Sequence, residues 1–95
     1  MKIEFDPVKS ARNVELRGLA FDLVVEFDFD SAQIVTDERR EYGETRYRAI
    51  GRLRDDIAAV VFTMREETLR VISLRLASRK ERRQYEKAKS EAGSG

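Results

Sequence analysis

Three consecutive segments of the chain, residues 45–53, 57–64 and 69–76, have the pattern of β-strands and are separated by short polar stretches. In the first segment, small or apolar side chains alternate with arginines, which is typical of a strand with one buried face. The second segment is apolar on both faces, as in a strand at the centre of a sheet. Short connections of this kind join antiparallel neighbours. The three segments therefore predict an antiparallel meander with residues 57–64 in the middle.

Alternation within the third segment predicts how its side chains divide between the faces of the sheet. Strict alternation gives two sets, Ile72, Leu74 and Leu76 on one face and Val71, Ser73 and Arg75 on the other. Arg75 is therefore expected to project on the same side as Ser73. Two weaker strands are predicted at residues 2–5 and 33–36.

Two helices are predicted from their capping signals. Asp6 and Pro7 suit the N-cap and first position of a helix that ends at Gly18. Ser78-Arg79-Lys80-Glu81 matches the capping box S-x-x-E, so a second helix is expected over residues 79–88.

The chain has 95 residues, which predicts a single α+β domain. We assign residues 1–90 to this domain and residues 91–95 to a disordered tail. The segment at residues 21–29 is ambiguous. Its alternation favours a strand, whereas Leu23, Val24 and Phe27 would form one face of a short helix.

The chain contains no cysteine and no histidine. These absences exclude disulfides and thiolate metal sites, and remove both the commonest metal ligand and the usual general base near neutral pH. No apolar run approaches the length needed to cross a membrane, and the first residues do not resemble a signal peptide. We therefore expect a cytoplasmic protein without a membrane segment, metal or cofactor.

Charge is distributed unevenly along the chain, although the formal net charge is only +1. Residues 1–38 hold four Lys and Arg against nine Asp and Glu, a net charge of −5. Residues 69–95 hold eight against three, a net charge of +5. This asymmetry predicts a two-faced molecule, with one face for nucleic acid and another for a basic protein.

Basic residues concentrate where the last predicted strand meets the last predicted helix. This junction and the neighbouring strand carry Arg46, Arg48, Arg52, Arg70, Arg75, Arg79, Lys80, Arg82, Arg83 and Lys89. If their faces coincide, the arginines can bind RNA phosphates, and Tyr47 or Tyr85 can stack on an unpaired base. A solvated arginine-rich surface without a ligand is the competing interpretation.

RNA can be cleaved without a metal ion when its 2′-hydroxyl attacks the adjacent phosphate. Fixed cations would stabilise the negative charge that builds on the phosphoryl and leaving oxygens. In the absence of histidine, proton carriers are expected among the side chains Glu44, Tyr47, Tyr85 and Lys9. The sequence is therefore compatible with a metal-independent ribonuclease.

Three blocks of the sequence together resemble the BrnT toxin family. FDPVKSARNVELRGLAF is similar to the opening of that family, with matches at Phe5, Asp6, Pro7, Lys9, Asn13, Gly18 and Phe21. GETRYRAIG is similar to G-E-x-R-x-x-x-I-G, with matches at Gly43, Glu44, Arg46, Ile50 and Gly51. RVISLRLASRKERRQYE is similar to R-I-I-S-A-R-x-A-x-x-x-E-R-x-x-Y, with matches at Arg70, Ile72, Ser73, Arg75, Ala77, Glu81, Arg82 and Tyr85.

The resemblance implies a type II toxin with a RelE-like fold, an antiparallel meander with N-terminal helices and a C-terminal helix packed on the sheet. It also implies an endoribonuclease that inhibits translation and is neutralised by a BrnA-like ribbon-helix-helix antitoxin. Such pairs form hetero-oligomers that reach operator DNA only through the antitoxin. From the matched blocks and the basic junction, we expect catalytic roles for Arg46, Arg75, Arg79, Tyr85 and Glu44, and RNA binding by Lys9, Arg48, Arg65, Arg70 and Arg82.

Two departures from the family pattern concern groups that could carry protons. The usual Lys-His before the glycine is Leu16-Arg17, and a central-strand position that is often Tyr or His is Phe62. The chain is therefore also compatible with a non-catalytic binding module or an inactive toxin relic in a repressor complex. Direct binding to duplex DNA is less favoured, since there is no helix-turn-helix or zinc pattern. The family's corresponding segment is helical, so we expect a short helix at residues 21–27.

Overall fold

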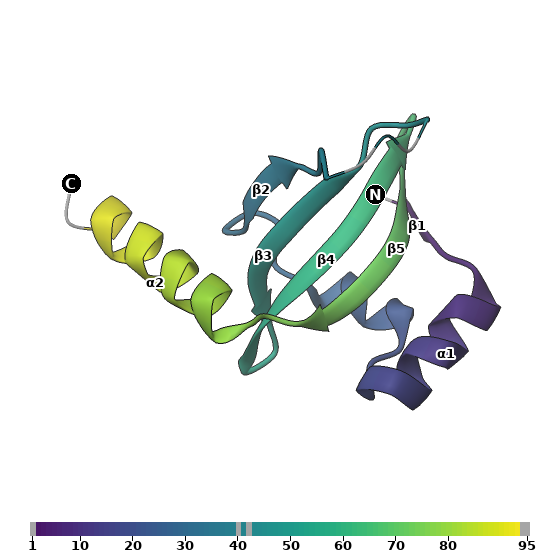
Figure 1. The fold of residues 1–95 in the computed structure, drawn as a ribbon, viewed down its shortest axis with the longest axis horizontal. Helices are drawn as coiled ribbons and strands as arrows, with labels where there is room; N and C mark the ends of the chain where they lie inside the picture. The colour runs from purple at the N-terminus through teal and green to yellow at the C-terminus, as the bar shows by residue number, and fades with distance from the viewer. Residues whose placement is uncertain (1, 40, 42, 94–95) are drawn as a thin grey trace.

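The computed structural model describes residues 2–39, 41 and 43–93. It shows a five-stranded sheet with helices toward both ends of the chain (Figure 1). The elements are β1 (Lys2–Glu4), α1 (Pro7–Arg17), the 3₁₀ helix η1 (Phe21–Glu26), β2 (Gln33–Thr36), β3 (Tyr47–Leu53), β4 (Asp56–Arg65), β5 (Thr68–Leu76) and α2 (Arg79–Gly93). The predicted α+β class is confirmed.

The strand order across the sheet is β1-β5-β4-β3-β2. The predicted meander is confirmed, because β3, β4 and β5 pair antiparallel in chain order with β4 at the centre. Arg54 and Glu66 lie in its two tight turns with positive φ angles of 56° and 58°. The sheet as a whole is mixed, since β1 pairs parallel to β5.

Both predicted helix caps are confirmed. The carboxylate of Asp6 accepts a hydrogen bond of 2.9 Å from the N–H two residues later, and α1 ends at Gly18 in the left-handed conformation, φ 72°. At the start of α2, the N–H of Ser78 donates to Glu81 Oε1 at 2.8 Å. The N–H of Glu81 donates to Ser78 Oγ at 3.2 Å, which completes the capping box.

The ambiguous segment forms η1, so the expected short helix is confirmed and the strand-like alternation is misleading. Three residues per turn place Phe21, Val24 and the following Phe27 on one side. These side chains are 2%, 1% and 5% exposed, whereas Val25 is 71% exposed. The spacing of three therefore decides which residues are buried.

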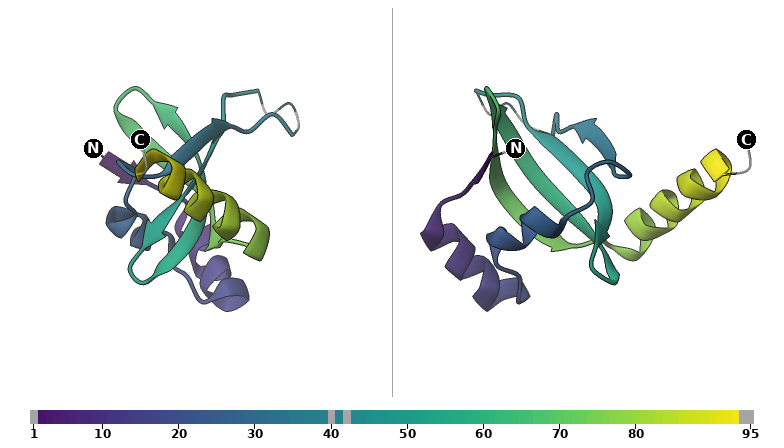
Figure 2. Two further views of the ribbon diagram at one scale, coloured as in Figure 1. Left: turned by 90° about the vertical axis from the view of Figure 1, so that its left-hand side faces the viewer. Right: turned by 180° about the vertical axis from the view of Figure 1, so that it is seen from behind.

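One face of the sheet is covered by α1 and η1, as the view from behind in Figure 2 shows. The core on this face consists of Phe21, Val24, Phe27, Ala49, Leu53, Ala58, Val60, Phe62, Leu69, Val71 and Leu74. Two polar side chains tie α1 to this layer. Asn13 Nδ2 donates to the carbonyls of Leu19 and Leu74 at 2.7 and 2.9 Å, and Ser10 Oγ accepts from the N–H of Phe21 at 2.9 Å.

Strict alternation fails in β5, so the predicted orientation of Val71 is wrong. The pairing of β4 with β5 skips Ile72, which is the extra residue of a β-bulge. Val71 therefore joins the core at 3% exposure, while Ile72 is only half-buried. Ser73 and Arg75 still share one side of the sheet, as predicted.

The helix α2 contacts the other face of the sheet mainly through Tyr85, and its Glu81 also pairs with Arg75 of β5. Tyr85 is 3% exposed and packs with Ile50, Ile57 and Ala59. Beyond this anchor α2 runs past its predicted end to Gly93 and projects from the body of the molecule (Figure 1). The predicted packing of the C-terminal helix on the sheet is thus local. The predicted disordered tail lies partly outside the described residues, and its described part is helical.

Candidate functional site

The sheet face opposite α1 and η1, called the open face below, is lined by arginines. Its side chains are Arg48, Ile50, Arg52, Ile57, Ala59, Val61, Thr63, Arg70, Ser73 and Arg75. Paired positions form rows across β3, β4 and β5, first Arg48–Val61–Ser73 and then Ile50–Ala59–Arg75. The central strand contributes only uncharged side chains to these rows. The open face is therefore an uncharged strip with arginines on both flanks.

Arg48 on β3 has a hydrogen-bonding group without a partner. Its side chain is half-buried, and its Nε is shielded from solvent with no hydrogen-bond acceptor among the described residues. A buried donor left unpaired costs roughly 1–3 kcal/mol, so such groups are rare unless a ligand or water pairs with them. Val61 and the hydroxyl residue Ser73 follow Arg48 in the same row. An anionic acceptor would reach this Nε only if the side chains that shield it move aside.

Arg75 lies in the next row and is paired with a carboxylate from α2. Its Nη1 and Nη2 donate to Glu81 Oε1 and Oε2 at 2.6 and 2.9 Å. These hydrogen bonds lower the pKa of Glu81 to about 2, which partial burial opposes. They also raise the pKa of Arg75, against the effect of the nearby positive charge of Arg39. Arg75 is therefore a charged side chain paired with Glu81. Strands two apart place it about 10 Å from the β3 backbone.

The other predicted cations of the sheet also have carboxylate partners. Arg70 Nη1 lies 3.3 Å from Glu4 Oε1, and both Arg46 and Arg65 contact Glu44, at 3.3 and 3.6 Å. The predicted arginines therefore lie along the sheet at several places. These arginines do not gather around one point where a single phosphate could contact all of them.

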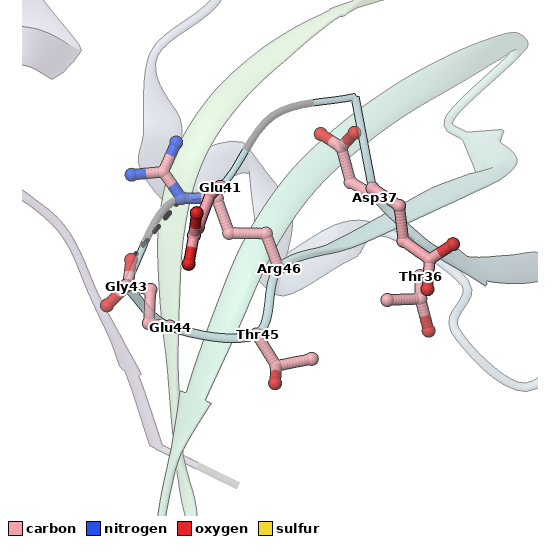
Figure 3. A pocket seen from close by; sticks show the side chains of 8 residues that line it. Thr36, Asp37, Glu41, Gly43, Glu44, Thr45 and Arg46 are labelled. Atoms are coloured by element: carbon pink, nitrogen blue, oxygen red, sulfur yellow. Dashed lines mark hydrogen bonds and ion pairs between the residues drawn. The ribbon is translucent and has the colours of Figure 1, made fainter.

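Glu44 and Arg46 lie at one end of β3, in a hollow of about 570 Å³ (Figure 3). The described residues that line it are Thr36, Asp37, Glu38, Glu41, Gly43, Glu44, Thr45 and Arg46. Carboxylates predominate in this lining. The hollow therefore does not favour phosphate, and the arginine Nε is directed toward Glu44.

Tyr85 of α2 lies toward the opposite end of β3, where it packs against Ile50, Ile57 and Ala59. The Nζ of Lys89 lies 5.7 Å from its ring centre. Arg79 and Arg82 are exposed on the same helix, and Arg82 pairs with Glu86 at 3.6 Å. The two predicted proton carriers, Glu44 and Tyr85, are therefore at opposite ends of the open face.

Lys9 is exposed on α1, which covers the other side of the sheet. Tyr47 and Phe62 also face that side, where their rings stack with centres 5.5 Å apart. A Tyr or His in place of Phe62 would therefore not reach the arginines of the open face. The structure does not bring Lys9 or Tyr47 together with Arg48 and Arg75.

Some residues that match the family pattern have structural explanations. Asn13 satisfies two carbonyls of the core layer. A Cβ added to Gly51 would lie 2.9 Å from both Ala32 Cβ and Phe27 Cζ, so this position requires a glycine for packing. These residues position the sheet and are not part of the site.

The sequence pattern does not single out Arg48 among the predicted RNA-binding arginines, and it gives no sign that Arg39 lies near Arg75. The alternation of arginines in β3 indicates that Arg48 shares a face with Arg46 and Arg52, but it cannot show which arginine lacks an acceptor. Arg39 lies far from the basic junction in sequence, and no pattern in the chain connects it with Arg75.

No cluster of three or more His, Cys, Asp or Glu side chains suited to a metal ion occurs among the described residues. In the same part of the chain, no helix has the length and apolar composition of a membrane span.

An α+β sheet with one covered face and one arginine-flanked face defines a small protein suited to bind an anionic chain. The family model for the ribonuclease toxin BrnT of type II toxin–antitoxin systems matches residues 5–81. The chain therefore belongs to the BrnT family, as the sequence blocks predicted. Membership implies an RNA substrate and an antitoxin partner. The comparison with curated proteins found no match.

Proposed function

We propose that this protein is a metal-independent endoribonuclease of RelE-like fold that cleaves RNA in the cytoplasm and so inhibits translation. A BrnA-like ribbon-helix-helix antitoxin would neutralise it in a hetero-oligomer that reaches operator DNA through the antitoxin. The observation that supports RNA binding on the open face is the unpartnered Nε of Arg48, next to the uncharged strip of β4.

In this proposal the RNA backbone follows the open face from Arg46 past Arg48 and Arg75 toward Arg79 and Arg82 of α2. We assign Arg48 to the phosphate that reacts, because its side chain lies on the open face and its Nε has no acceptor among the described residues. Ser73 in the same row supplies a further hydrogen bond. The 2′-oxygen bonds to phosphorus as the bond between phosphorus and the 5′-oxygen breaks. One candidate proton carrier accepts the 2′-hydroxyl proton, water protonates the leaving 5′-oxygen, and the arginines stabilise the charge on the phosphoryl oxygens.

Glu44 and Tyr85 remain our candidate proton carriers. They lie at opposite ends of β3, so a single phosphodiester cannot contact both in this arrangement. Arg65 and Arg70 would then contact flanking phosphates, while Lys9 on the covered side contributes least.

The experiment measures cleavage of single-stranded RNA by the purified protein in excess chelator. Arg48→Ala is expected to reduce the cleavage rate about 10²-fold or more, the usual cost of removing one donor to a developing oxyanion. Arg12→Ala is the matched control, since Arg12 is exposed on α1. Equal cleavage by the Arg48→Ala and parent proteins would refute the assignment, and cleavage abolished by the chelator would refute metal independence.

The alternative is a non-catalytic module or toxin relic, which the carboxylate pairing of Arg70 and Arg75 favours. This alternative predicts RNA binding without cleavage. It also predicts no growth arrest when the chain is expressed in bacteria without an antitoxin.

A further inference from the structure

The edge strand β2 is exposed in a way that is unusual for a free sheet edge. It pairs with β3 on one side only, and its sequence QIVT contains no lysine or proline of the kind that protects edges. Ile34 and Val35 are 46% and 50% exposed on its two faces. An apolar, unprotected edge of this kind is a ready template for another strand.

The backbone of β2 offers hydrogen-bonding groups on its free side. The N–H of Asp37, directly after β2, donates to the carbonyl of Arg46 at 2.7 Å. Because direction alternates along a strand, Gln33 and Val35 point toward β3, and Ile34 and Thr36 point away from it. Neither Ile34 nor Thr36 has a backbone partner on that side among the described residues.

Carboxylates flank this edge at both ends. Residues 18–38 contain six Asp and Glu and no Lys or Arg. Asp30 before β2 and Glu38 after it are exposed, and neither side chain has an ion pair among the described residues. The edge therefore combines an apolar centre with acidic ends.

We propose that β2 is a docking edge for an extended segment of a partner protein that is apolar in its centre and basic at both ends. The segment adds a strand through the N–H and C=O groups of Ile34 and Thr36. Its apolar side chains cover Ile34 and Val35, and its Lys or Arg residues meet Asp30 and Glu38. This inference does not depend on ribonuclease activity.

The charge pattern argues against a second copy of this chain as the occupant. Antiparallel pairing of two β2 strands centred on Ile34 would place Asp30 of one copy opposite Glu38 of the other. Like charges directly opposite destabilise a strand pair. RNA is also disfavoured as the occupant, because its phosphates would meet the acidic side chains of Asp30 and Glu38 at this edge.

The test is amide hydrogen exchange measured by NMR on the full chain, with the synthetic peptide Lys-Arg-Val-Thr-Val-Thr-Val-Arg-Lys as the probe. In the free protein, the amides of Ile34 and Thr36 should exchange fast, because they point outward. At a peptide concentration about ten times Kd, both should slow about tenfold. The same peptide with Glu in place of Lys and Arg should give no protection.

Two variants separate docking from fold stability. Thr36→Pro removes an outward donor and leaves the β2–β3 ladder intact, so it should abolish peptide binding while Val35 keeps its slow exchange. The double substitution Asp30→Asn and Glu38→Gln should weaken binding and its dependence on salt, whereas Asp55→Asn, in an exposed turn, should not. Equal binding of the acidic peptide would overturn the proposal, as would concentration-dependent protection without peptide. Unchanged exchange at Ile34 and Thr36 with the basic peptide would overturn it too.

Discussion

The two faces of the sheet are formed by the same strands, but they differ in the kind of side chain they carry and in how deeply those side chains are buried. On the covered face, the rows contain Ala49, Val60 and Leu74, each fully buried. On the open face, the two neighbouring rows each contain an arginine. One row is Arg48, Val61 and Ser73, and the other is Ile50, Ala59 and Arg75. The difference shows that the chain concentrates its apolar packing on one side.

The open face holds a group that does not contribute to stability. The Nε of Arg48 is a buried donor without an acceptor among the described residues. Proteins retain such arrangements mainly where a ligand uses them. We infer that the covered face provides most of the stability, to which Tyr85 and its apolar partners on the open face add, and that the arginines of the open face provide binding.

The largest effect on stability is expected from the first of two substitutions at adjacent valines of β4, one on each face of the sheet. Val60→Ala should lower the free energy of unfolding by about 2 kcal/mol, because Val60 is 0% exposed and a cavity would remain. Val61→Ala, the same change on the open face, should cost less than about 1 kcal/mol, since Val61 is only partly buried. Urea unfolding measures both values. Equal losses would contradict the division between the faces.

Much of this architecture follows from local patterns in the sequence. The caps at Asp6 and Ser78 depend on neighbouring residues only, so they could be predicted well. The central position of β4 also followed from its apolar sequence on both faces. The short helix η1 was predicted from family resemblance, because alternation alone favoured a strand.

The remaining features depend on tertiary contacts that no local pattern encodes. The bulge at Ile72 changes the orientation of Val71 and is set by pairing with β4. The burial of Tyr85 depends on where α2 meets the sheet. The carboxylate partner of each arginine is likewise a product of the fold, as the contact between Arg70 and Glu4 shows.

A smaller effect should come from the carboxylate that α2 places against the open face. The folded-state pKa of Glu81 is about 2, below the ordinary value of 4.5, so its contribution is complete above pH 4.5 and is lost as the pH falls toward 2. Glu81→Gln should therefore reduce the free energy of unfolding by up to about 1 kcal/mol at pH 7 and by almost nothing near pH 2. Thermal unfolding across this pH range measures the difference.

Glu86→Gln is the control for this prediction, because Glu86 forms a largely exposed pair with Arg82 one turn further along α2. Its effect on stability should be smaller than that of Glu81→Gln. A stability difference for Glu81→Gln that stays constant between pH 7 and pH 2 would rule out the ion pair with Arg75 as its cause.

The smallest effect on stability should occur at Arg48, where the loss of function should be greatest. Arg48→Met keeps an unbranched side chain that reaches about as far as Nε, and it removes the unpaired donor with the rest of the guanidinium. The free energy of unfolding should therefore stay the same or rise by up to about 1 kcal/mol. RNA binding, measured by fluorescence anisotropy at fixed salt, should weaken in the same variant. A loss of more than about 1 kcal/mol would mean that Arg48 supports the fold, and the open face would then share the stabilising role of the covered one.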